Sequence, residues 1–363
     1  MTPTLVTSLP IAITMGDPSG IGPEIIVKAF MQEPELTQNC FVVGDVAAMR
    51  RAAGFVASGR EFAIKIEAIL EAEIGTQPAY SPLRVLQIGE QKEGVFAATE
   101  PFEIGKISAK SGKAAADAVV WAARAALRGQ IAALVTTPLH KEALALAGVK
   151  FPGHTELLQA ESAAFLGKTI EQVPVRMMLA NEELRTVLVS IHMSLRDAIE
   201  AVSYDNVIET IRITRDFLHR TVGEKSRRRI AVAGLNPHAG EGGLFGREEI
   251  EIISPAIAAA QKEGIDVVGP FAPDTVFMRA RDKLVNNIKK LGEFDAVIAM
   301  YHDQGLIPVK YLGVEQGVNV TLGLPLVRTS PDHGTAFDIA GQGIADAASL
   351  IAAIKMAKSL VKV

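Results

Sequence analysis

Apolar and polar positions alternate along this chain in blocks that have the lengths of strands and helices. Short apolar runs, which predict buried strands, occupy residues 11–15, 41–43, 83–88 and 131–135. Longer amphipathic segments at about 23–31 and 113–127 predict helices, the second of them rich in alanine. Strands that alternate with helices in this way are typical of parallel sheets with crossover helices. The pattern therefore predicts an α/β protein.

The middle of the chain departs from strict alternation. Residues 175–179 and 184–191 are neighbouring apolar runs with only a short polar stretch between them. This spacing predicts an antiparallel hairpin, so we expect mixed, largely parallel sheets flanked by helices. Residues 58–103 are polar and irregular, and the sequence assigns them no chemistry.

Three histidines follow predicted strands. They are His192, His238 and His302, which come after the apolar runs 186–191, 230–235 and 296–300. Imidazoles at the carboxyl ends of strands can bind a divalent metal and leave a position open for substrate. The whole chain has only seven histidines, so three in this setting indicate a metal-assisted enzyme.

Two carboxylates lie near these histidines in the predicted fold. Asp303 follows His302 directly, and Asp274 stands in an Ala-Pro-Asp-Thr segment. Each of them either orients an imidazole, as carboxylates do around metal ligands, or caps a helix, and the sequence leaves both readings open. No pattern identifies the catalytic group that accepts a proton.

Composition limits the class of protein further. A chain of 363 residues, 48% hydrophobic and 5% aromatic, is long enough for two α/β domains. The net charge of −4 gives no reason to expect nucleic acid. Cys40 is the only cysteine, which excludes an intrachain disulfide and a thiolate metal cluster. Without a signal-peptide pattern or a run of about 18 apolar residues, we expect a cytoplasmic protein with no membrane partner.

Two glycine-containing loops stand near the ends of the chain. Residues 16–24, GDPSGIGPE, join the first strand to the first helix, and residues 332–341, DHGTAFDIAG, precede the last helix. The first loop is either an anion site built from backbone amides or a glycine-rich connector. The chain contains neither a GxGxxG fingerprint nor a GxxxxGK[ST] phosphate loop.

These two loops resemble the signature loops of the isocitrate and isopropylmalate dehydrogenase fold, in which the late loop wraps the adenosine part of NAD. The motifs FPGHTELL, HMSLRDA, GLNPHAGEGG, AMYHDQGL and GVNVTLGLPLVRTSPDHGTA narrow the match. Together they resemble the 4-hydroxythreonine-4-phosphate dehydrogenase family of vitamin B6 biosynthesis. The resemblance runs from Ile11 to the last helix and is weak between about residues 59 and 101.

The resemblance implies roles for particular residues. It makes His192, His238 and His302 the metal ligands, and it assigns substrate contacts to His154, Thr155, Lys310, Asn319 and Arg328. The late loop, through His333, Gly334, Thr335, Ala336 and Asp338, is implied to hold the cofactor. The first histidine stands in SIHMSL where the family form is TTHLPL, so its fine positioning differs.

The resemblance also implies an architecture and a reaction. It predicts a first α/β domain of residues 1–138 and 306–363 and a second of residues 139–305, with the active site in the cleft between them. It further predicts a homodimer with a shared site, NAD or NADP as cofactor, and one zinc, magnesium or cobalt ion per subunit. The implied reaction oxidises C3 of 4-phosphooxy-L-threonine and then removes CO2, yielding 3-amino-2-oxopropyl phosphate.

Two alternatives remain at this point. A related dehydrogenase would act on a four-carbon sugar-acid phosphate, such as threonate or erythronate 4-phosphate, and would differ only around C2. A non-catalytic binding protein of the same fold would need to have lost a ligand or the cofactor loop, and the sequence shows neither loss.

Overall fold

The structure is a computed structural model that describes residues 9–57, 64–75, 82–89, 101–221, 228–285, 288–313 and 316–361. It divides into two compact units. The first comprises Met1–Pro174 and Leu324–Val361, and the second comprises Val175–Gly323. The unit boundaries therefore differ from the predicted divisions after residues 138 and 305.

The first unit is built on a parallel sheet in the strand order β3-β4-β2-β1-β5-β14. Its strands are β1 (Ile11–Thr14), β2 (Cys40–Gly44), β3 (Ile66–Ile69), β4 (Leu83–Gln87), β5 (Ala133–Thr136) and β14 (Arg328–Pro331). The central strands β1, β2 and β5 are buried along their whole length, as parallel strands covered on both faces are. The strand β3 lies in the stretch that was predicted to be irregular.

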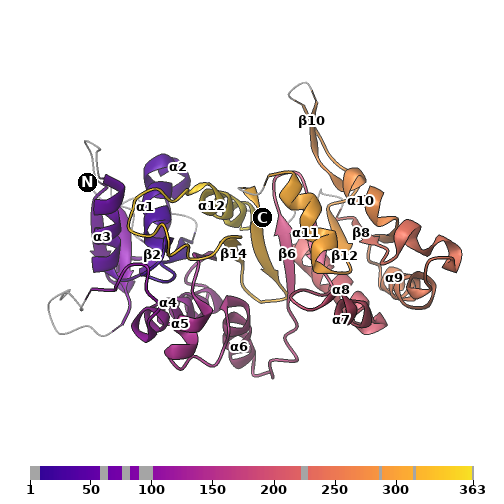
Figure 1. The fold of residues 1–363 in the computed structure, drawn as a ribbon, viewed down its shortest axis with the longest axis horizontal. Coiled ribbons are helices and arrows are strands. Elements are labelled where there is room, and N and C mark those ends of the chain that lie inside the picture. Colours follow the sequence, from indigo (N-terminus) through magenta and orange to yellow (C-terminus); the bar gives the residue numbers. More distant parts are fainter. Residues whose placement is uncertain are drawn as a thin grey trace. The chain divides into compact units, whose positions relative to one another are not determined.

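Helices cover this sheet, and their packing explains why the first unit extends beyond residue 138 to Pro174. They are α1 (Gly22–Gln32), α2 (Pro34–Thr37), α3 (Val46–Ala57), α4 (Ala109–Leu127), α5 (Lys141–Leu146), α6 (His154–Leu166) and α12 (Ala348–Leu360), with a short 3-10 turn at Glu71–Glu73 (Figure 1). The alanine-rich α4 approaches α5 so closely that a Cβ on Gly112 would lie 2.0 Å from the Ala143 carbonyl oxygen. Arg124 of α4 also pairs with Glu161 of α6 at 2.7 Å. Residues 139–174 therefore belong to the first unit.

The second unit contains a mixed sheet in the order β13-β6-β7-β12-β8-β9. Its strands are β6 (Arg176–Ala180), β7 (Arg185–Leu188), β8 (Ile230–Ala233), β9 (Val267–Phe271), β12 (Ala296–Ala299) and β13 (Val318–Leu322). Strands β7, β12, β8 and β9 are parallel, whereas β6 pairs antiparallel with both β7 and β13. The predicted hairpin and the predicted α/β class with mixed, largely parallel sheets are confirmed. A separate two-stranded ribbon joins β10 (Lys283–Val285) to β11 (Ile288–Lys290).

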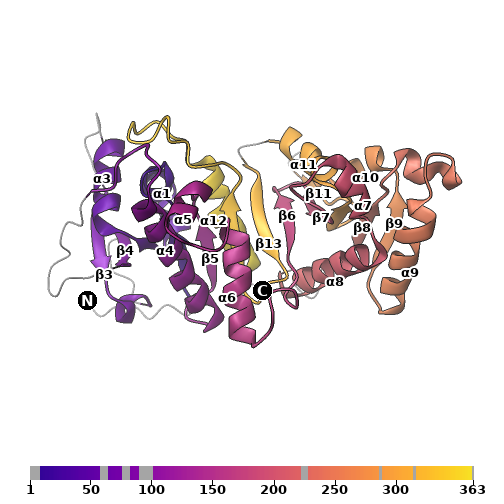
Figure 2. The ribbon, with the colours of Figure 1, turned by 60° about the horizontal axis from the view of Figure 1, so that its bottom comes forward.

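The helices of the second unit are α7 (Leu195–Glu200), α8 (Tyr204–Thr221), α9 (Ser254–Lys262), α10 (Pro273–Ala280) and α11 (His302–Tyr311), with short turns at Pro237–Gly243 and Glu249–Ile253. The helices α8 and α9 pack against each other beside the sheet (Figure 2). None of the helices in the described ranges is long and apolar enough to cross a membrane.

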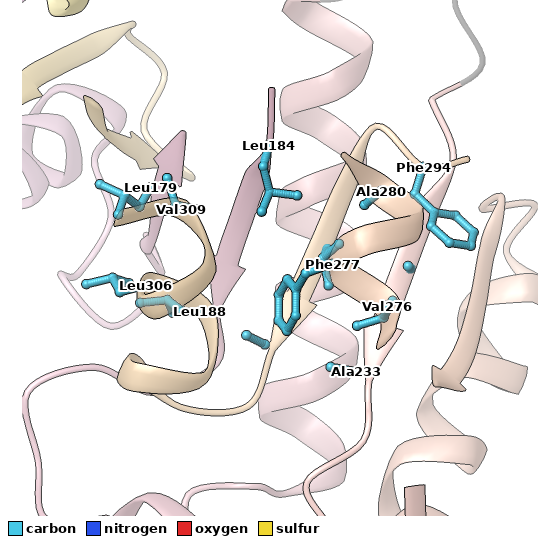
Figure 3. Close-up of a cluster of buried hydrophobic side chains, with 13 residues drawn as sticks. Leu179, Leu184, Leu188, Ala233, Val276, Phe277, Ala280, Phe294, Leu306 and Val309 are labelled. Carbon is cyan, nitrogen blue, oxygen red and sulfur yellow. The ribbon is translucent and has the colours of Figure 1, made fainter. Parts of the chain in front are cut away.

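The packing of α11 explains why the second unit extends beyond residue 305 to Gly323. Its Leu306 and Val309 lie in a buried cluster with Leu179 and Leu188 of the neighbouring strands (Figure 3). The Thr186 hydroxyl also donates to the Gly305 carbonyl at 3.1 Å. Residues 306–323 are therefore part of the second unit, where burial of apolar side chains stabilises α11 against β6 and β7.

Candidate active site

The three histidines of the sequence prediction follow three neighbouring strands. The central strand of the trio, β12, pairs in parallel with β7 on one side and β8 on the other. His192 comes after β7, His238 after β8, and His302 begins α11 directly after β12. Because parallel strands end at one edge of a sheet, all three loops open on the same edge of the second unit.

Two of these imidazoles lie next to each other. The ring centroids of His192 and His302 are 5.5 Å apart, with the rings tilted by 46°. His302 Nδ1 lies 2.7 Å from the Asp303 carboxylate, and His238 Nδ1 lies 2.9 Å from the Glu241 carboxylate. A carboxylate on one ring nitrogen orients an imidazole and directs the other nitrogen, Nε2, outward, as in metal sites. Of the two readings open for Asp303, the structure favours orientation of the imidazole.

His238 does not join the other two rings. Within the described ranges, no three His, Cys, Asp or Glu side chains are already gathered as a metal site. His238 stands in a loop whose residues from His238 to Gly242 all have positive φ, between 44° and 80°. Only two of the three predicted ligands are thus adjacent, although the donor types and the flanking carboxylates fit a divalent ion.

A buried carboxylate that the sequence reading missed holds this loop. Glu249 is 2% exposed. Its Oε1 accepts the backbone N–H groups of Leu235 and Asn236 at 2.8 and 2.7 Å, and its Oε2 accepts the Asn236 amide at 3.0 Å. No sequence motif links Glu249 to this loop, so the contact is seen only in the folded chain.

A second group of predicted residues lies around Thr136, the last residue of β5 in the first unit. Arg328 is 4% exposed, and its Nε and a terminal nitrogen donate to the Thr136 hydroxyl at 3.0 and 2.8 Å. Burial lowers the pKa of Arg328 to about 10, against a nearby Glu156 that raises it, so the guanidinium stays charged at neutral pH. His154 and Thr155 begin α6 beside it.

His154 is held neutral in this setting. Burial lowers its pKa well below the ordinary value of 6.5, and the positive charge of Arg328 acts in the same direction. Its Nε2 atom is buried and has no hydrogen-bond partner in the structure. A buried guanidinium, an unsatisfied imidazole nitrogen and the start of a helix together form a cluster that suits an anion.

Two further polar groups near this turn were not singled out as site residues. Asp17 is fully buried, and burial raises its pKa to about 6, with a backbone hydrogen bond from Ser19 and the nearby His140 lowering it. The Asp17 Oδ2 and His140 Nδ1 atoms are both buried without a partner. His140 also stacks on Phe337 of the late loop at 5.1 Å between ring centroids. Asp17 stands inside the GDPSGIGPE motif, which was the signal that could have identified it.

The opening loop does not present its first amides to a ligand. The N–H groups of Ser19 and Gly20 donate to Asp17, at 2.9 and 3.0 Å. The N–H of Ile21 donates to the carbonyl of Thr335 in the late loop at 3.0 Å. Of the two readings of this loop, the structure favours a connector that binds the late loop.

The predicted cofactor residues lie together in that late loop. His333, Gly334 and Asp338 are exposed, whereas Thr335 is 8% exposed and bonded to the opening loop. Ala336 has a φ of 42°, which marks a sharp turn between them. The exposed positions therefore surround an anchored one, which suits a loop that binds a ligand on its outer side.

The remaining predicted substrate residues belong to the second unit. Lys310 lies in the last turn of α11, the helix that His302 begins, and Asn319 lies in β13 opposite Leu179 of β6. Both side chains are partly buried. The predicted substrate contacts are thus divided between the units, with His154, Thr155 and Arg328 in the first.

Both units have polar loops at the carboxyl ends of parallel strands, which is typical of α/β enzymes, and the buried cluster around the Arg328 guanidinium suits a small anionic substrate. The family model of the pyridoxal phosphate biosynthetic protein PdxA matches residues 36–357. The chain belongs to this family and is an oxidoreductase.

Individual relatives agree with this assignment. A 4-hydroxythreonine-4-phosphate dehydrogenase of Beijerinckia indica is 51% identical over 97% of this chain and 95% of its own length. A D-threonate 4-phosphate dehydrogenase of Salmonella typhimurium is 44% identical over 96% of this chain and 98% of its own length. The crystal structure of a 4-hydroxythreonine-4-phosphate dehydrogenase from Klebsiella pneumoniae matches 99% of this chain and 100% of its own with a TM-score of 0.83 and 39% identity.

Proposed function

We propose that this chain oxidises 4-phosphooxy-L-threonine at C3 with a nicotinamide cofactor and a divalent metal, and then releases CO2 to form 3-amino-2-oxopropyl phosphate. The observation that carries the proposal is the set of histidines on neighbouring strand ends, two with their Nδ1 atoms on carboxylates. The family description and the relative at 51% identity supply the substrate class.

The reaction balances in two steps. In the first, hydride leaves C3 for the oxidised nicotinamide while the C3 hydroxyl loses its proton, which gives a β-keto acid. In the second, the C1–C2 bond breaks, CO2 departs, and its electron pair remains at C2, which then takes up a proton. A divalent cation, when bound, supplies polarisation of the C3 oxygen that favours both steps.

The metal would be held by His192, His238 and His302. The pair His192 and His302 already lies 5.5 Å apart between ring centroids, and each nitrogen ligand of zinc sits at about 2.0–2.1 Å from the ion. His238 lies apart from this pair. The proposal therefore includes a movement of the Pro237–Gly243 turn that brings the His238 imidazole toward the other two rings. Three imidazoles favour zinc or cobalt, and an oxygen-rich substrate could complete a site for magnesium.

In the first unit, Arg328, His154 and Thr155 would hold the phosphate, and in the second unit Lys310 is a candidate contact for an anionic group of the substrate. Arg328 presents a planar fork of donors and Lys310 a point charge, which are two ways to hold an anionic group. The neutral His154 binds through a hydrogen bond rather than through charge. Asn319 offers an amide to the polar groups of the substrate, and the late loop from His333 to Asp338 would hold NAD or NADP.

We also propose that the chain works as a homodimer. Ile307 and Tyr311 are 63% and 90% exposed and stand one helical turn apart on α11, the helix that carries His302 and Lys310. Neighbouring large apolar side chains exposed in this way are typical of a surface that another chain covers. A second copy seated there would pack on the helix that begins with His302.

An absorbance assay for NADH formation tests the function. The chain, loaded with zinc, cobalt or magnesium, is given 4-phosphooxy-L-threonine or D-threonate 4-phosphate, with NAD or NADP. The proposal expects faster turnover of the amino substrate. The relative at 44% identity makes the hydroxy acid the second candidate, and a preference for threonate 4-phosphate would reverse the assignment. No turnover with either substrate would favour a non-catalytic binding protein.

A further inference from the structure

The late loop is held at two separate places, first by the loop that leads into α1 and then by α1 itself. At its start, the Ile21 N–H donates to Thr335, and a Cβ on Gly20 would lie 2.8 Å from the Thr335 carbonyl oxygen. At its end, the chain that leads into α12 runs past α1, and Glu24 of α1 bonds to it (Figure 1). The exposed Asp338 lies between these two contacts, whereas the exposed His333 and Gly334 precede the first of them.

The second fastening consists of two side chains one turn apart on α1. The Glu24 carboxylate accepts the N–H of Gly341 on Oε1 at 2.5 Å and the N–H of Gly343 on Oε2 at 2.7 Å. The Lys28 ammonium donates to the Ala345 carbonyl at 2.5 Å. Glu24 and Lys28 are only 2% and 8% exposed. Helical neighbours at this spacing commonly pair with each other, but here each bonds to the backbone of a distant segment.

The segment is shaped for this contact. Gly341 and Gly343 have φ values of 81° and 68°, which favour glycine. A Cβ on Gly343 would lie 2.5 Å from the Phe55 carbonyl oxygen, and one on Gly341 would lie 2.9 Å from Ile104. Successive amides in such a backbone form a concavity that binds an anion. In this chain Glu24 fills the concavity, so the loop end is closed by a side chain rather than by a ligand.

We infer that Glu24 and Lys28 are positioning residues for the cofactor, which set its affinity by fixing the end of the late loop. This inference rests on the proposed function, because it takes the late loop as the cofactor site. Within the described part of the chain, the Glu24 and Lys28 side chains bond to the backbone before α12 and not to the candidate metal or phosphate residues. Substitution of either residue is therefore expected to weaken binding of the cofactor and to leave binding of metal and phosphate unchanged.

The test compares Glu24→Gln with Glu33→Gln in the full chain. A glutamine at position 24 keeps the shape but turns one acceptor into a donor, so one glycine amide loses its partner. Glu33 is a carboxylate at the other end of α1, half-exposed and 3.8 Å from Lys355, and serves as the matched control. Titration with NADH, followed by fluorescence, should show binding weakened by about 10-fold or more in Glu24→Gln, as for loss of a hydrogen bond to a charged group. Glu33→Gln should bind as wild type does.

Two readouts separate positioning from general damage. Amide exchange followed by mass spectrometry should rise in residues 338–345 of Glu24→Gln and stay unchanged in α12. The KM for NAD should rise while kcat and the KM for the phosphorylated substrate stay within about 2-fold. If Glu24→Gln does not fold, Lys28→Met removes only the Ala345 contact and should raise the KM for NAD by a smaller factor.

The outcomes distinguish the inference from the function on which it rests. Unchanged NADH affinity in Glu24→Gln, beside a wild type that binds NADH, overturns the inference alone. A rise in both KM values and in exchange throughout the chain overturns it too, because the role is then structural. A wild type that binds neither NADH nor NADPH overturns the proposed function, and the cofactor role of Glu24 with it.

Discussion

The imidazoles of His192 and His302 lie 5.5 Å apart between ring centroids, although they follow separate strands of the sheet. The pairing of β7 with β12 produces this approach, because His302 begins α11 where β12 ends and His192 stands in the loop after β7. The Asp303 carboxylate fixes the orientation of the His302 ring through Nδ1. This arrangement is the basis of the proposed metal site.

Replacing either histidine of this pair should remove metal and activity together. We expect His192→Ala and His302→Ala to bind less metal by elemental analysis and to lose turnover, while the melting temperature changes little. His219→Ala is the control, because His219 is exposed on α8 and contacts Arg228 instead. Full activity of His302→Ala in metal-free buffer would contradict the proposed metal site.

Glu249 should control the third candidate ligand, His238. Because it accepts the Leu235 and Asn236 amides, Glu249→Gln replaces one acceptor by a donor at a buried site. We expect metal affinity to fall by about 10-fold, in the range seen when partners of metal ligands are changed. The exposed Glu251, which pairs with Arg247, gives the control Glu251→Gln. Equal metal affinity in Glu249→Gln and Glu251→Gln would mean that other contacts hold the loop that contains His238.

Arg328 should act on the phosphate of the substrate. A hydrogen bond to a charged group contributes roughly 1.5–3 kcal/mol, so Arg328→Ala should lower kcat/KM by about 10- to 100-fold. Arg328→Lys should recover only part, because an ammonium lacks the planar fork. A substrate without the phosphate is the control, and wild type and Arg328→Ala should turn it over about equally. The same loss on both substrates would make Arg328 a structural residue, held by Thr136.

Asp17 should give the folded chain a distinct pH dependence. Its pKa rises from 3.8 to about 6 on burial, so the folded state binds the proton more tightly than the unfolded state. The contribution of Asp17 to stability is then full below pH 3.8 and is lost as pH rises to about 6. Asp17→Asn should therefore be more stable than wild type at pH 7–8, by roughly 3 kcal/mol at most, with a smaller difference near pH 4.

Urea unfolding of both proteins between pH 4 and 8 measures this difference. An asparagine keeps an oxygen that can accept the Ser19 N–H, so the loop geometry is preserved. A constant difference in the free energy of unfolding across this range would contradict the titration of Asp17.

Tyr311 should mark the dimer surface. Tyr311→Glu places a charge on a side chain that is 90% exposed, so it should leave the fold intact and weaken association. Sedimentation should show a dimer for wild type and a larger monomer fraction for the variant, with a parallel loss of activity. Leu146→Glu, at an exposed apolar position of the first unit, is the control. A fully active wild-type monomer would exclude the proposed assembly.

Much of this architecture was predictable from local patterns. Apolar runs predicted β1, β2, β5 and the three strands before the histidines, because buried parallel strands are apolar along their whole length. The hairpin of β6 and β7 was also predicted from a local feature, the short polar stretch between two apolar runs. The identity of the candidate ligands was also predicted from the sequence, since each histidine stands in the segment that follows a strand.

Tertiary structure alone decided the contacts between distant segments. The bond of Glu249 to the His238 loop, the bond of Glu24 to Gly341 and the approach of Arg328 to Thr136 join positions that no periodicity connects. The boundaries of the two compact units differ from the predicted divisions for the same reason, because α5, α6 and α11 belong where their apolar faces pack. Local sequence determines whether a segment forms a strand or a helix, but burial and hydrogen bonding across the fold determine which segments meet.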